Sequence, residues 1–261
     1  MFTYGELADH DFSLEIAQKK YLKNNATTEV PATYYKSRVC GKMGKETFTY
    51  GEKLSGLSEK EKALYKPTSL TITLYDTLNS IYGFTFNTVN KPMQPLIQIR
   101  KVDTEEWSEY PLSSEAMYSF NKDGLTVTYY YSKTEISLEP STAYVYRAYD
   151  KGADVGTAET TLITKDPNAS TFTFVHVSDS QDGPNYFNRV LSAITDNADF
   201  LLHTGDVVEW SKYEEEWTAM LDGNYKYLSQ IPIMAISGNH ETSYRNGLNE
   251  TFKHFNNIIP T

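Results

Sequence analysis

Short runs of alternating or β-branched apolar residues occupy the middle of the chain and predict a β-sheet domain. Gly, Asn, Asp and Pro separate these runs, and they are the residues that favour turns. The predicted strands are Leu70–Tyr75, Ile81–Phe86, Leu96–Ile99, Leu125–Tyr131, Glu135–Leu138, Ala143–Tyr149 and Glu159–Ile163. About seven short strands with this spacing are typical of a β-sandwich, which we place at residues 66–165.

The pattern changes after Lys165–Asn168, a short linker. Three near-continuous apolar runs follow, at Phe172–Val177, Phe200–His203 and Ile231–Ile236. Continuous runs of this kind are typical of parallel strands that are buried on both faces. The chain therefore changes from an antiparallel to a parallel sheet near this linker.

Helical patterns separate the three apolar runs. After Asn185, apolar residues recur at helical spacing, and Ser211 and Glu214 have the spacing of a capping box that starts a second helix. The order strand, helix, strand, helix, strand (βαβαβ) predicts the first half of an α/β domain at residues 170–261, because three parallel strands make a small sheet. We therefore expect a mixed fold, with a β-sandwich followed by an α/β segment that leaves apolar surface uncovered.

Residues 1–65 form a polar leader to which we assign no role. Phe12–Lys23 has apolar residues at helical spacing, and the capping box Ser58–Glu61 predicts a short helix that ends near Tyr65. The first six residues lack the basic and apolar regions of a signal peptide, so the protein is either intracellular or follows a signal that has been removed. No apolar stretch reaches the roughly 18–20 residues that a membrane helix needs.

The net charge of −10 argues against a general role in binding nucleic acids or anionic membranes. The acidity is concentrated in residues 170–261, which hold 12 Asp and Glu residues against 5 Lys and Arg residues. The single cysteine, Cys40, excludes an intrachain disulfide and a cysteine-based zinc site. A cation site in this chain would therefore use carboxylates, amides and histidines.

A short polar signature follows each apolar run of the predicted parallel sheet, at Ser178–Gln181, Thr204–Asp206 and Ser237–Glu241. The carboxyl ends of such strands lie at one edge of the sheet, where ligands bind. Two carboxylates, an amide and an imidazole thus meet at one edge, and these donors favour a site for two hard or borderline metal ions. By contrast, His176 and His203 lie inside the strands, and we interpret them as hydrogen-bonded core residues.

The motifs resemble those of a known family. Asp179, Gly205-Asp206 and Gly238-Asn239-His240-Glu241, each after a strand, resemble the motifs of the calcineurin-like metallophosphoesterases. Leu138–Tyr144 resembles the Leu-x-Pro-x-Thr-x-Tyr corner of fibronectin type III domains, in which the tyrosine hydroxyl bonds back to the preceding turn. A domain of this type before the catalytic one is typical of the purple acid phosphatase-like branch. The resemblance covers about residues 66–261 and favours a secreted or extracytoplasmic protein.

The resemblance implies a dinuclear metal-dependent phosphoester hydrolase, that is, an acid-phosphatase-like phosphomonoesterase or phosphodiesterase. Asp179 would bind the first metal, Asp206 would bridge both ions, and Asn239 would add its side-chain oxygen to the second. Asn239 and His240 would also face the phosphoester substrate, with His240 as general acid to the leaving alkoxide or as a clamp on the phosphate. The two ions would be iron, zinc or manganese.

The chain departs from the family pattern in three places. Gln181 stands where the wider family has the histidine of Asp-x-His, and it offers an amide oxygen as a ligand. Glu209 stands where the purple branch has a tyrosinate, and it either ligates or is solvated. The family's later histidines have no counterpart, since His254 fits neither of their contexts. We therefore expect an N-terminal portion with an incomplete metal site, which is inactive by itself.

Two other classes of function stay open on the sequence. Gln181 and the missing histidines also fit a pseudoenzyme that binds metal or phosphate without catalysis. Alternatively, the sandwich is the functional part, as a surface or carbohydrate-binding module. The incomplete α/β sheet is expected to favour self-association through its uncovered surface.

Overall fold

The computed structural model describes a large part of the chain after residue 57. The described residues are 30–31, 47–48, 57, 59–122, 125–181, 184–194, 198–211, 213–242, 255–256 and 258–259. Two short antiparallel strands, β1 (Val30–Pro31) and β2 (Thr47–Phe48), and helix α4 (Glu59–Ala63) precede the main body. The short helix predicted near residues 58–65 is therefore confirmed, whereas the helical stripe at 12–23 lies outside the described residues.

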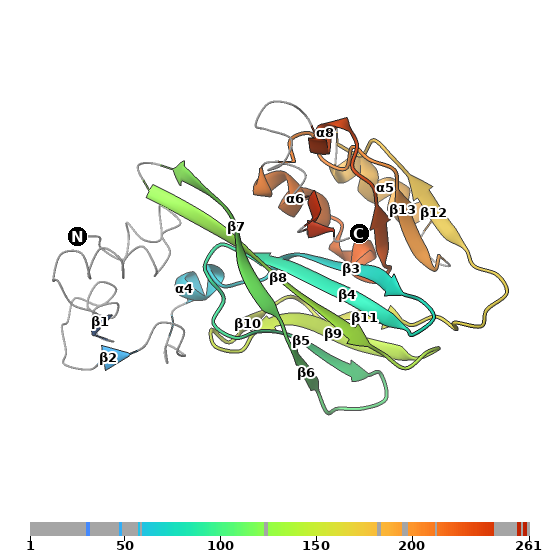
Figure 1. Ribbon diagram of the computed structural model, residues 1–261, viewed down its shortest axis with the longest axis horizontal. Helices are drawn as coiled ribbons and strands as arrows, with labels where there is room; N and C mark the ends of the chain where they lie inside the picture. Colours follow the sequence, from blue (N-terminus) through green and yellow to red (C-terminus); the bar gives the residue numbers. More distant parts are fainter. Residues whose placement is uncertain are drawn as a thin grey trace.

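Nine strands form two antiparallel sheets. They are β3 (Thr68–Asp76), β4 (Ile81–Thr88), β5 (Pro95–Lys101), β6 (Ser108–Pro111), β7 (Ser113–Lys122), β8 (Leu125–Ser137), β9 (Ala143–Asp150), β10 (Val155–Gly156) and β11 (Thr160–Ile163). One sheet has the order β3-β4-β8-β7, and the other has the order β10-β9-β5-β6 with β11 also paired to β9. Figure 1 shows these strands below the helices and strands that follow them.

Every predicted strand of this region overlaps an observed strand, with Leu138 and Glu159 one residue outside it, and two larger differences remain. The runs Leu125–Tyr131 and Glu135–Leu138 belong to one long strand, β8, because β4 and β7 pair with it on either side. Strands β6 and β7 were not expected. The β7 segment, Ser113–Lys122, has a weak apolar alternation, so its ladder with β8 defines it as a strand more than its own residues do.

The two antiparallel sheets share one hydrophobic core. Phe84 from one sheet meets Tyr146 from the other edge-on, with ring centroids 5.4 Å apart. The buried apolar members of this core are Leu70, Ile72, Tyr82, Phe84, Phe86, Ile97, Ile99, Leu112, Ile136, Leu138, Tyr144, Tyr146, Ala148 and Leu162. Removal of this apolar surface from water is the main force that holds the sheets together.

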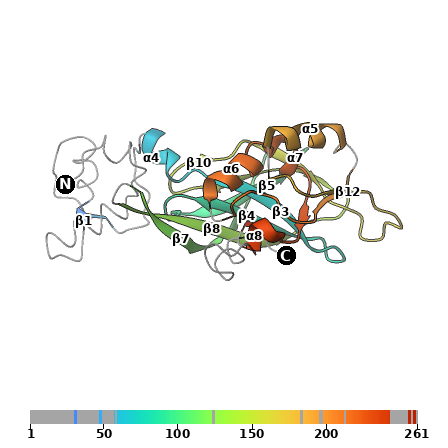
Figure 2. The same ribbon diagram turned by 90° about the horizontal axis from the view of Figure 1, so that it is seen from above.

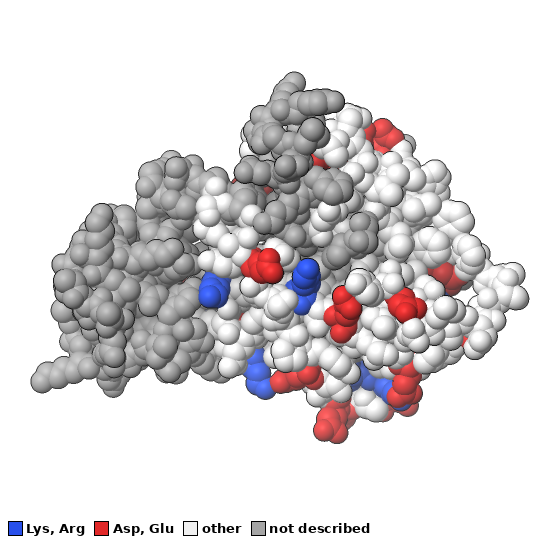
Figure 3. Space-filling model, viewed as in Figure 1, with Lys and Arg blue, Asp and Glu red and all other residues white. Residues whose placement is uncertain are grey.

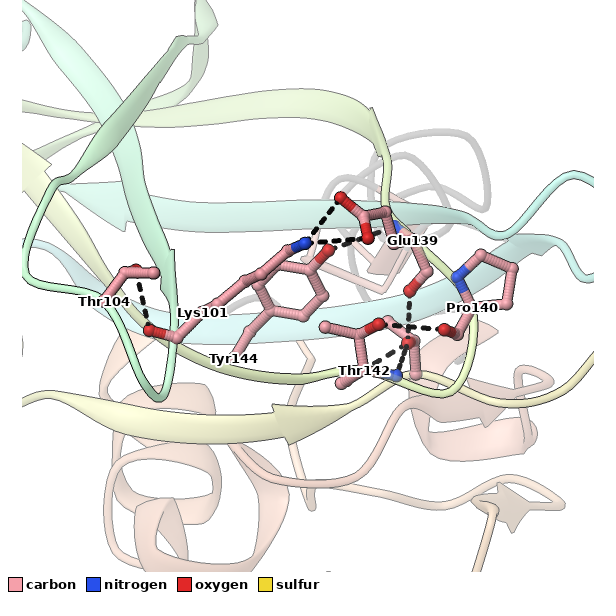
Figure 4. Close-up of polar contacts among 7 residues, drawn as sticks. Lys101, Thr104, Glu139, Pro140, Thr142 and Tyr144 are labelled. Atoms are coloured by element: carbon pink, nitrogen blue, oxygen red, sulfur yellow. Dashed lines mark hydrogen bonds and ion pairs between the residues drawn. The ribbon is translucent and has the colours of Figure 1, made fainter.

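The turn before β9 has the hydrogen bond that its sequence predicts (Figure 4). The backbone N–H of Glu139 donates to the hydroxyl oxygen of Tyr144 over 3.0 Å. In the same turn, the hydroxyl of Thr142 donates to the carbonyl of Pro140 over 2.8 Å. On the surface, the ammonium of Lys101 lies 2.7 Å from the carboxylate of Glu139. The tyrosine thus fixes the turn that connects β8 in one sheet to β9 in the other.

The chain after residue 170 forms a three-stranded parallel sheet with the order β12-β13-β14. Its elements are β12 (Phe174–Val177), α5 (Pro184–Ile194), β13 (Phe200–His203), α6 (Glu214–Leu221), α7 (Tyr225–Leu228), β14 (Ile233–Ala235) and α8 (Asn239–Thr242). Viewed from above, α5 and α8 lie on opposite sides of the molecule (Figure 2). No helix in the described ranges is long and apolar enough to span a membrane.

One face of the parallel sheet is buried, whereas apolar side chains on the other face are exposed among the described residues; we call it the bare face. Leu201 and Ile233 point into a second core together with Leu191 and Trp217. On the opposite face, the exposed fractions of Phe172, Phe174 and Ile236 are 68%, 45% and 56%. Parallel sheets are normally covered on both faces, so this aromatic face is unusual.

The two strand histidines differ because they lie on these two faces. His203 is buried and its Nε2 lies 2.9 Å from the hydroxyl oxygen of Ser180, which confirms the predicted hydrogen-bonded core histidine. His176 is exposed on the bare face, with its Nε2 3.0 Å from the hydroxyl oxygen of Thr204. The prediction of a core position for His176 is therefore wrong, because the structure covers only one side of β12.

A buried polar network joins the parallel part to the antiparallel sheets. Glu214 is 1% exposed, and its carboxyl group accepts hydrogen bonds from Asn87 Nδ2 at 2.7 Å and Ser69 Oγ at 3.4 Å. Asp222 accepts the backbone N–H of Ser69 at 2.8 Å. The predicted capping box of Ser211 and Glu214 is wrong, because Glu214 is the first residue of α6 and points across to β3 and β4. The side chain that should cap the helix instead connects the two parts of the molecule.

Burial makes this connection sensitive to pH. Burial raises the pKa of the Glu214 carboxyl group from 4.5 to about 8, although the hydrogen bonds from Asn87 and Ser69 oppose the shift. Because the folded pKa lies above the unfolded one, the folded state holds the proton more tightly. The free energy of unfolding should therefore fall as the pH rises from about 4.5 to about 8, and it should change little above that.

We predict that Glu214→Gln removes much of this pH dependence. Each unit of pKa shift corresponds to about 1.4 kcal/mol, and the shift spans nearly the whole interval from pH 5 to pH 8, so the wild type should lose about 3–4 kcal/mol over this interval that the variant keeps. Urea unfolding at both pH values measures the difference. An equal loss of stability in the two proteins would show that Glu214 is not protonated in the fold.

Candidate functional site

The loops that follow β12, β13 and β14 lie side by side. The backbone N–H of Asp179 donates to the carbonyl of Gly205 at 3.1 Å, and that of Ser180 donates to the carbonyl of Asp206 at 2.9 Å. The backbone N–H of His240 donates to Asp206 Oδ1 at 2.9 Å. The structure thus brings Asp179, Asp206 and His240 to one edge of the sheet.

Both aspartates have a left-handed backbone directly after their strands. The φ angle is 56° at Asp179 and at Asp206, and it is 107° at Gly205. Aspartate tolerates this region better than most residues, but it still adopts it at a cost. Such conformations persist where the surroundings fix them, and they are often found at functional sites.

Gly238 is required by a close approach of two loops. A Cβ at this position would lie 2.2 Å from Asp206 Oδ1 and 2.5 Å from the backbone nitrogen of Asp206. A Cβ at Gly205 would lie 2.7 Å from the Cα of Gly238. The two glycines therefore let the loop after β14 pack directly against the aspartate of the loop after β13.

Glu241 holds these loops together, although the sequence pattern assigns it no role. Its carboxylate is fully buried and accepts backbone N–H groups from both loops. The donors are Asp206 at 2.8 Å, Val207 at 2.8 Å, Val208 at 3.3 Å and Gly238 at 2.8 Å. One signal was present: Glu241 is three residues after Gly238, which is the spacing at which a glutamate of a capping box reaches back to the N-cap N–H.

The ring of His240 is oriented by Glu209. Its Nδ1 lies 2.9 Å from the carbonyl oxygen of Glu209, and it also lies 3.4 Å from the Glu209 carboxylate. A carbonyl oxygen only accepts hydrogen bonds, so Nδ1 carries a proton and Nε2 is the free end of the ring. This hydrogen bond raises the pKa of His240, with burial opposing it and the nearby carboxylates adding to it.

The remaining candidates have different surroundings. Asp179 and Asn239 are exposed at the edge of the sheet, and Asn239 is the first residue of α8. Gln181 is half-buried, and its Oε1 is buried with no hydrogen-bond partner in the described structure. A buried amide oxygen without a partner costs free energy unless a further group occupies its lone pairs. The position of Gln181 therefore fits a residue that binds a metal ion better than a surface residue.

A buried, neutral histidine packs next to this edge of the sheet. Ser180 Oγ donates to the carbonyl of Val207 at 2.9 Å, so it accepts from Nε2 of His203 at 2.9 Å. Burial lowers the pKa of His203 to about 4, although the charges of Asp179 and Asp206 act in the opposite direction. His203 is thus an uncharged packing residue under the two aspartates.

The charge of the region agrees with a cation site. On the face shown in Figure 3, basic and acidic side chains lie close together over the antiparallel sheets. Among the described residues of these sheets, Lys101 pairs with Glu139 and Lys151 pairs with Glu109. Over residues 170–261, acidic residues outnumber basic ones by 12 to 5.

The donor set fits a hard cation in part. Carboxylate oxygens of Asp179 and Asp206 and the unpartnered amide oxygen of Gln181 are the type of ligand that such ions prefer. No group of three or more His, Cys, Asp and Glu residues with metal-binding geometry occurs within the described residues. These side chains therefore offer oxygen ligands but not a complete set of them.

Comparison with known proteins agrees with the geometry. Residues 172–260 match the family model of the calcineurin-like phosphoesterases. The structure is similar to a purple acid phosphatase from yellow lupin (Lupinus luteus) seeds, with a TM-score of 0.59 and 16% sequence identity. The similarity covers 76% of this chain but only 41% of the lupin chain, and at this identity it shows a common fold alone. No curated protein sequence matches the chain.

We predict that Gly238→Ala disrupts the contact between the two loops. The new methyl group would collide with Asp206 Oδ1, and overpacking of this kind costs roughly 1–3 kcal/mol. Thermal unfolding should show the loss, and the amide resonances of Asp206 and His240 should shift. Ser237→Ala, one residue earlier, adds no atoms and serves as the control. Unchanged stability and resonances in Gly238→Ala would contradict the close approach.

Proposed function

We propose that the protein is a metal-dependent phosphoester hydrolase, either a phosphomonoesterase or a phosphodiesterase, because residues 172–260 match the family model of the calcineurin-like phosphoesterases. The observation that carries the proposal is the joined set of loops that holds Asp179, Asp206 and His240 at one edge of the sheet. An edge of this kind is where open α/β sheets bind their ligands.

We assign the oxygen donors to two metal ions. Asp179 would hold the first ion, Asp206 would bridge the pair, and Asn239 would hold the second. Gln181 is supported as a ligand of the first ion by its buried, unpartnered oxygen. When bound, two such ions acidify a shared water and neutralise charge on the phosphoryl oxygens. Iron, zinc and manganese all suit this mixture of donors.

We assign His240 to the substrate. Because its Nδ1–H is held by the carbonyl of Glu209, its Nε2 is the end that can donate a proton to the leaving alkoxide or a hydrogen bond to the phosphate. The carbonyl oxygen and the carboxylate of Glu209 both lie close to Nδ1 of His240, so we assign Glu209 to orienting this ring and not to binding metal.

We propose that residues 66–165 are an accessory domain of the fibronectin type III type and that residues 170–261 are the first half of the catalytic domain. The supporting observations are the shared core of the two antiparallel sheets and the hydrogen bond of Tyr144 to the turn before it. The parallel order of β12, β13 and β14 with their intervening helices supports the second assignment.

A second candidate function has one observation in its favour. Gln181 stands where the wider family has a histidine, which also fits a protein that binds metal or phosphate without catalysis. The two functions differ in turnover and not in metal binding, which makes an activity assay decisive between them.

We predict different effects for two substitutions in the full-length protein. Asp206→Asn should lower metal content and turnover together, because the bridge sets the spacing and charge of the metal pair. His240→Ala should leave metal content largely intact and reduce turnover by about 10²–10⁴-fold, the usual contribution of a positioned acid. Metal analysis and hydrolysis of p-nitrophenyl phosphate measure both effects.

The control for these variants is His176→Ala, which removes an imidazole from the bare face of the sheet and should change neither quantity. We also expect residues 1–261 alone to show little turnover with any added metal. Robust hydrolysis by this chain that is insensitive to Asp206→Asn would contradict the assigned site.

We further propose that the isolated chain associates through its bare aromatic face. Phe174 stacks on Phe200 with centroids 5.4 Å apart, and Phe172 packs beside both, so the face presents a continuous apolar surface to water. Exposed patches of this kind promote association.

We predict that Phe172→Ser with Phe174→Ser reduces self-association of residues 1–261. Sedimentation velocity over a range of concentrations should show larger species for the wild type and fewer for the variant. Leu78→Ser, which removes an apolar side chain that is 77% exposed at the turn between β3 and β4, is the matched control. A wild-type chain that stays monomeric at all concentrations would exclude association through this face.

A further inference from the structure

We propose that Glu241 is a positioning residue that locks the loop after β13 to the loop after β14, and that this lock keeps Asp206 and His240 in their working arrangement. The inference rests on the proposed function for the roles of Asp206 and His240. The lock itself is a property of the fold and can be tested without metal or substrate.

One oxygen of Glu241 spans both loops. Its Oε2 accepts the backbone N–H of Asp206 and that of Gly238, each at 2.8 Å. Its Oε1 accepts the N–H of Val207 at 2.8 Å and that of Val208 at 3.3 Å. All four partners are donors, so only an ionised carboxylate, which has two accepting oxygens and no proton, satisfies them at the same time.

The lock continues through Asp206 to His240. The backbone N–H of His240 donates to Asp206 Oδ1 at 2.9 Å, which closes a ring that runs from Glu241 to Asp206 and back to the start of α8. Asp206 holds a left-handed backbone with φ of 56°, and its N–H is one of those that Glu241 accepts. Loss of the carboxylate would release the conformation that aims the Asp206 side chain.

The backbone around Glu241 is held by hydrogen bonds as well. Its carbonyl oxygen accepts the hydroxyl of Ser211 at 3.2 Å, and the hydroxyl of Thr242 donates to the carbonyl of Gly238 at 2.9 Å. The backbone and the buried carboxylate of Glu241 are therefore both held in place. Groups that orient metal ligands in this manner typically change metal affinity by roughly 10–100-fold when they are altered.

Glu241→Gln is the sharpest substitution, because it keeps the shape of the side chain and replaces one accepting oxygen by an NH₂ group that faces N–H donors. Glu214→Gln is the matched control, since it makes the same change at a glutamate that is 1% exposed but lies at the interface with the antiparallel sheets. Both variants and the wild type are studied as residues 1–261.

Two measurements test the proposal. In the metal-free proteins, the amide protons of Asp206, Val207 and Gly238 should exchange with solvent at least about tenfold faster in Glu241→Gln than in the wild type and in Glu214→Gln. Calorimetric titration with Mn²⁺ should show an affinity that is about 10–100-fold weaker in Glu241→Gln and unchanged in Glu214→Gln.

The outcomes separate the lock from the proposed function. If the wild type binds no Mn²⁺ but the three amides lose protection in Glu241→Gln, the lock stands and the metal site fails. If Glu241→Gln keeps both the amide protection and the affinity of the wild type, the lock is overturned. Should the variant fail to fold, scalar couplings across the hydrogen bonds from Asp206 and Gly238 to the Glu241 carboxyl carbon can be measured in the wild type, and their absence would overturn the lock.

Discussion

The arrangement of the candidate site depends on hydrogen bonds that hold Asp206 from three directions. Its N–H is accepted by Glu241, its carbonyl accepts the N–H of Ser180, and its Oδ1 accepts the N–H of His240. Ser180 comes from the loop after β12, whereas Glu241 and His240 both come from α8 after β14, so the segments after all three strands are placed relative to Asp206. The parallel pairing of β12, β13 and β14 makes this possible, because it ends all three strands at the same edge.

The loop that begins at Asp206 is anchored again at its far end. It leads into α6, whose first residue, Glu214, is buried against Asn87 and Ser69 of the antiparallel sheets. The candidate site is thus tied to the antiparallel sheets through the segment from Asp206 to Glu214. The buried carboxylate of Glu241 holds one end of this segment, and the buried carboxyl group of Glu214 holds the other. Burial raises the pKa of the Glu214 carboxyl group to about 8, so this group is neutral in acidic and neutral media, and its neutral form favours the connection.

The local pattern of apolar and polar residues was sufficient to predict the strands and the residues that follow them. The parallel runs and the polar residues after them placed Asp179, Asp206 and His240 at one edge, and the Tyr144 turn was evident from its motif. The errors arose where a partner distant in sequence decided the outcome. Glu214 was read as a cap but bonds across to another sheet, and β7 is a strand because β8 pairs with it. The role of Glu241 required knowing which backbone N–H groups lie around it.

If the loops after β12, β13 and β14 form one metal-binding edge, paramagnetic broadening by Mn²⁺ should be confined to them. Small additions of Mn²⁺ to ¹⁵N-labelled protein should broaden the amide resonances of Asp179, Asp206 and Asn239 first, while those near Tyr144 in the sandwich stay sharp. Asp206→Asn should abolish this selective broadening. Broadening that is absent, or that is spread evenly over the acidic residues of the surface, would contradict the account.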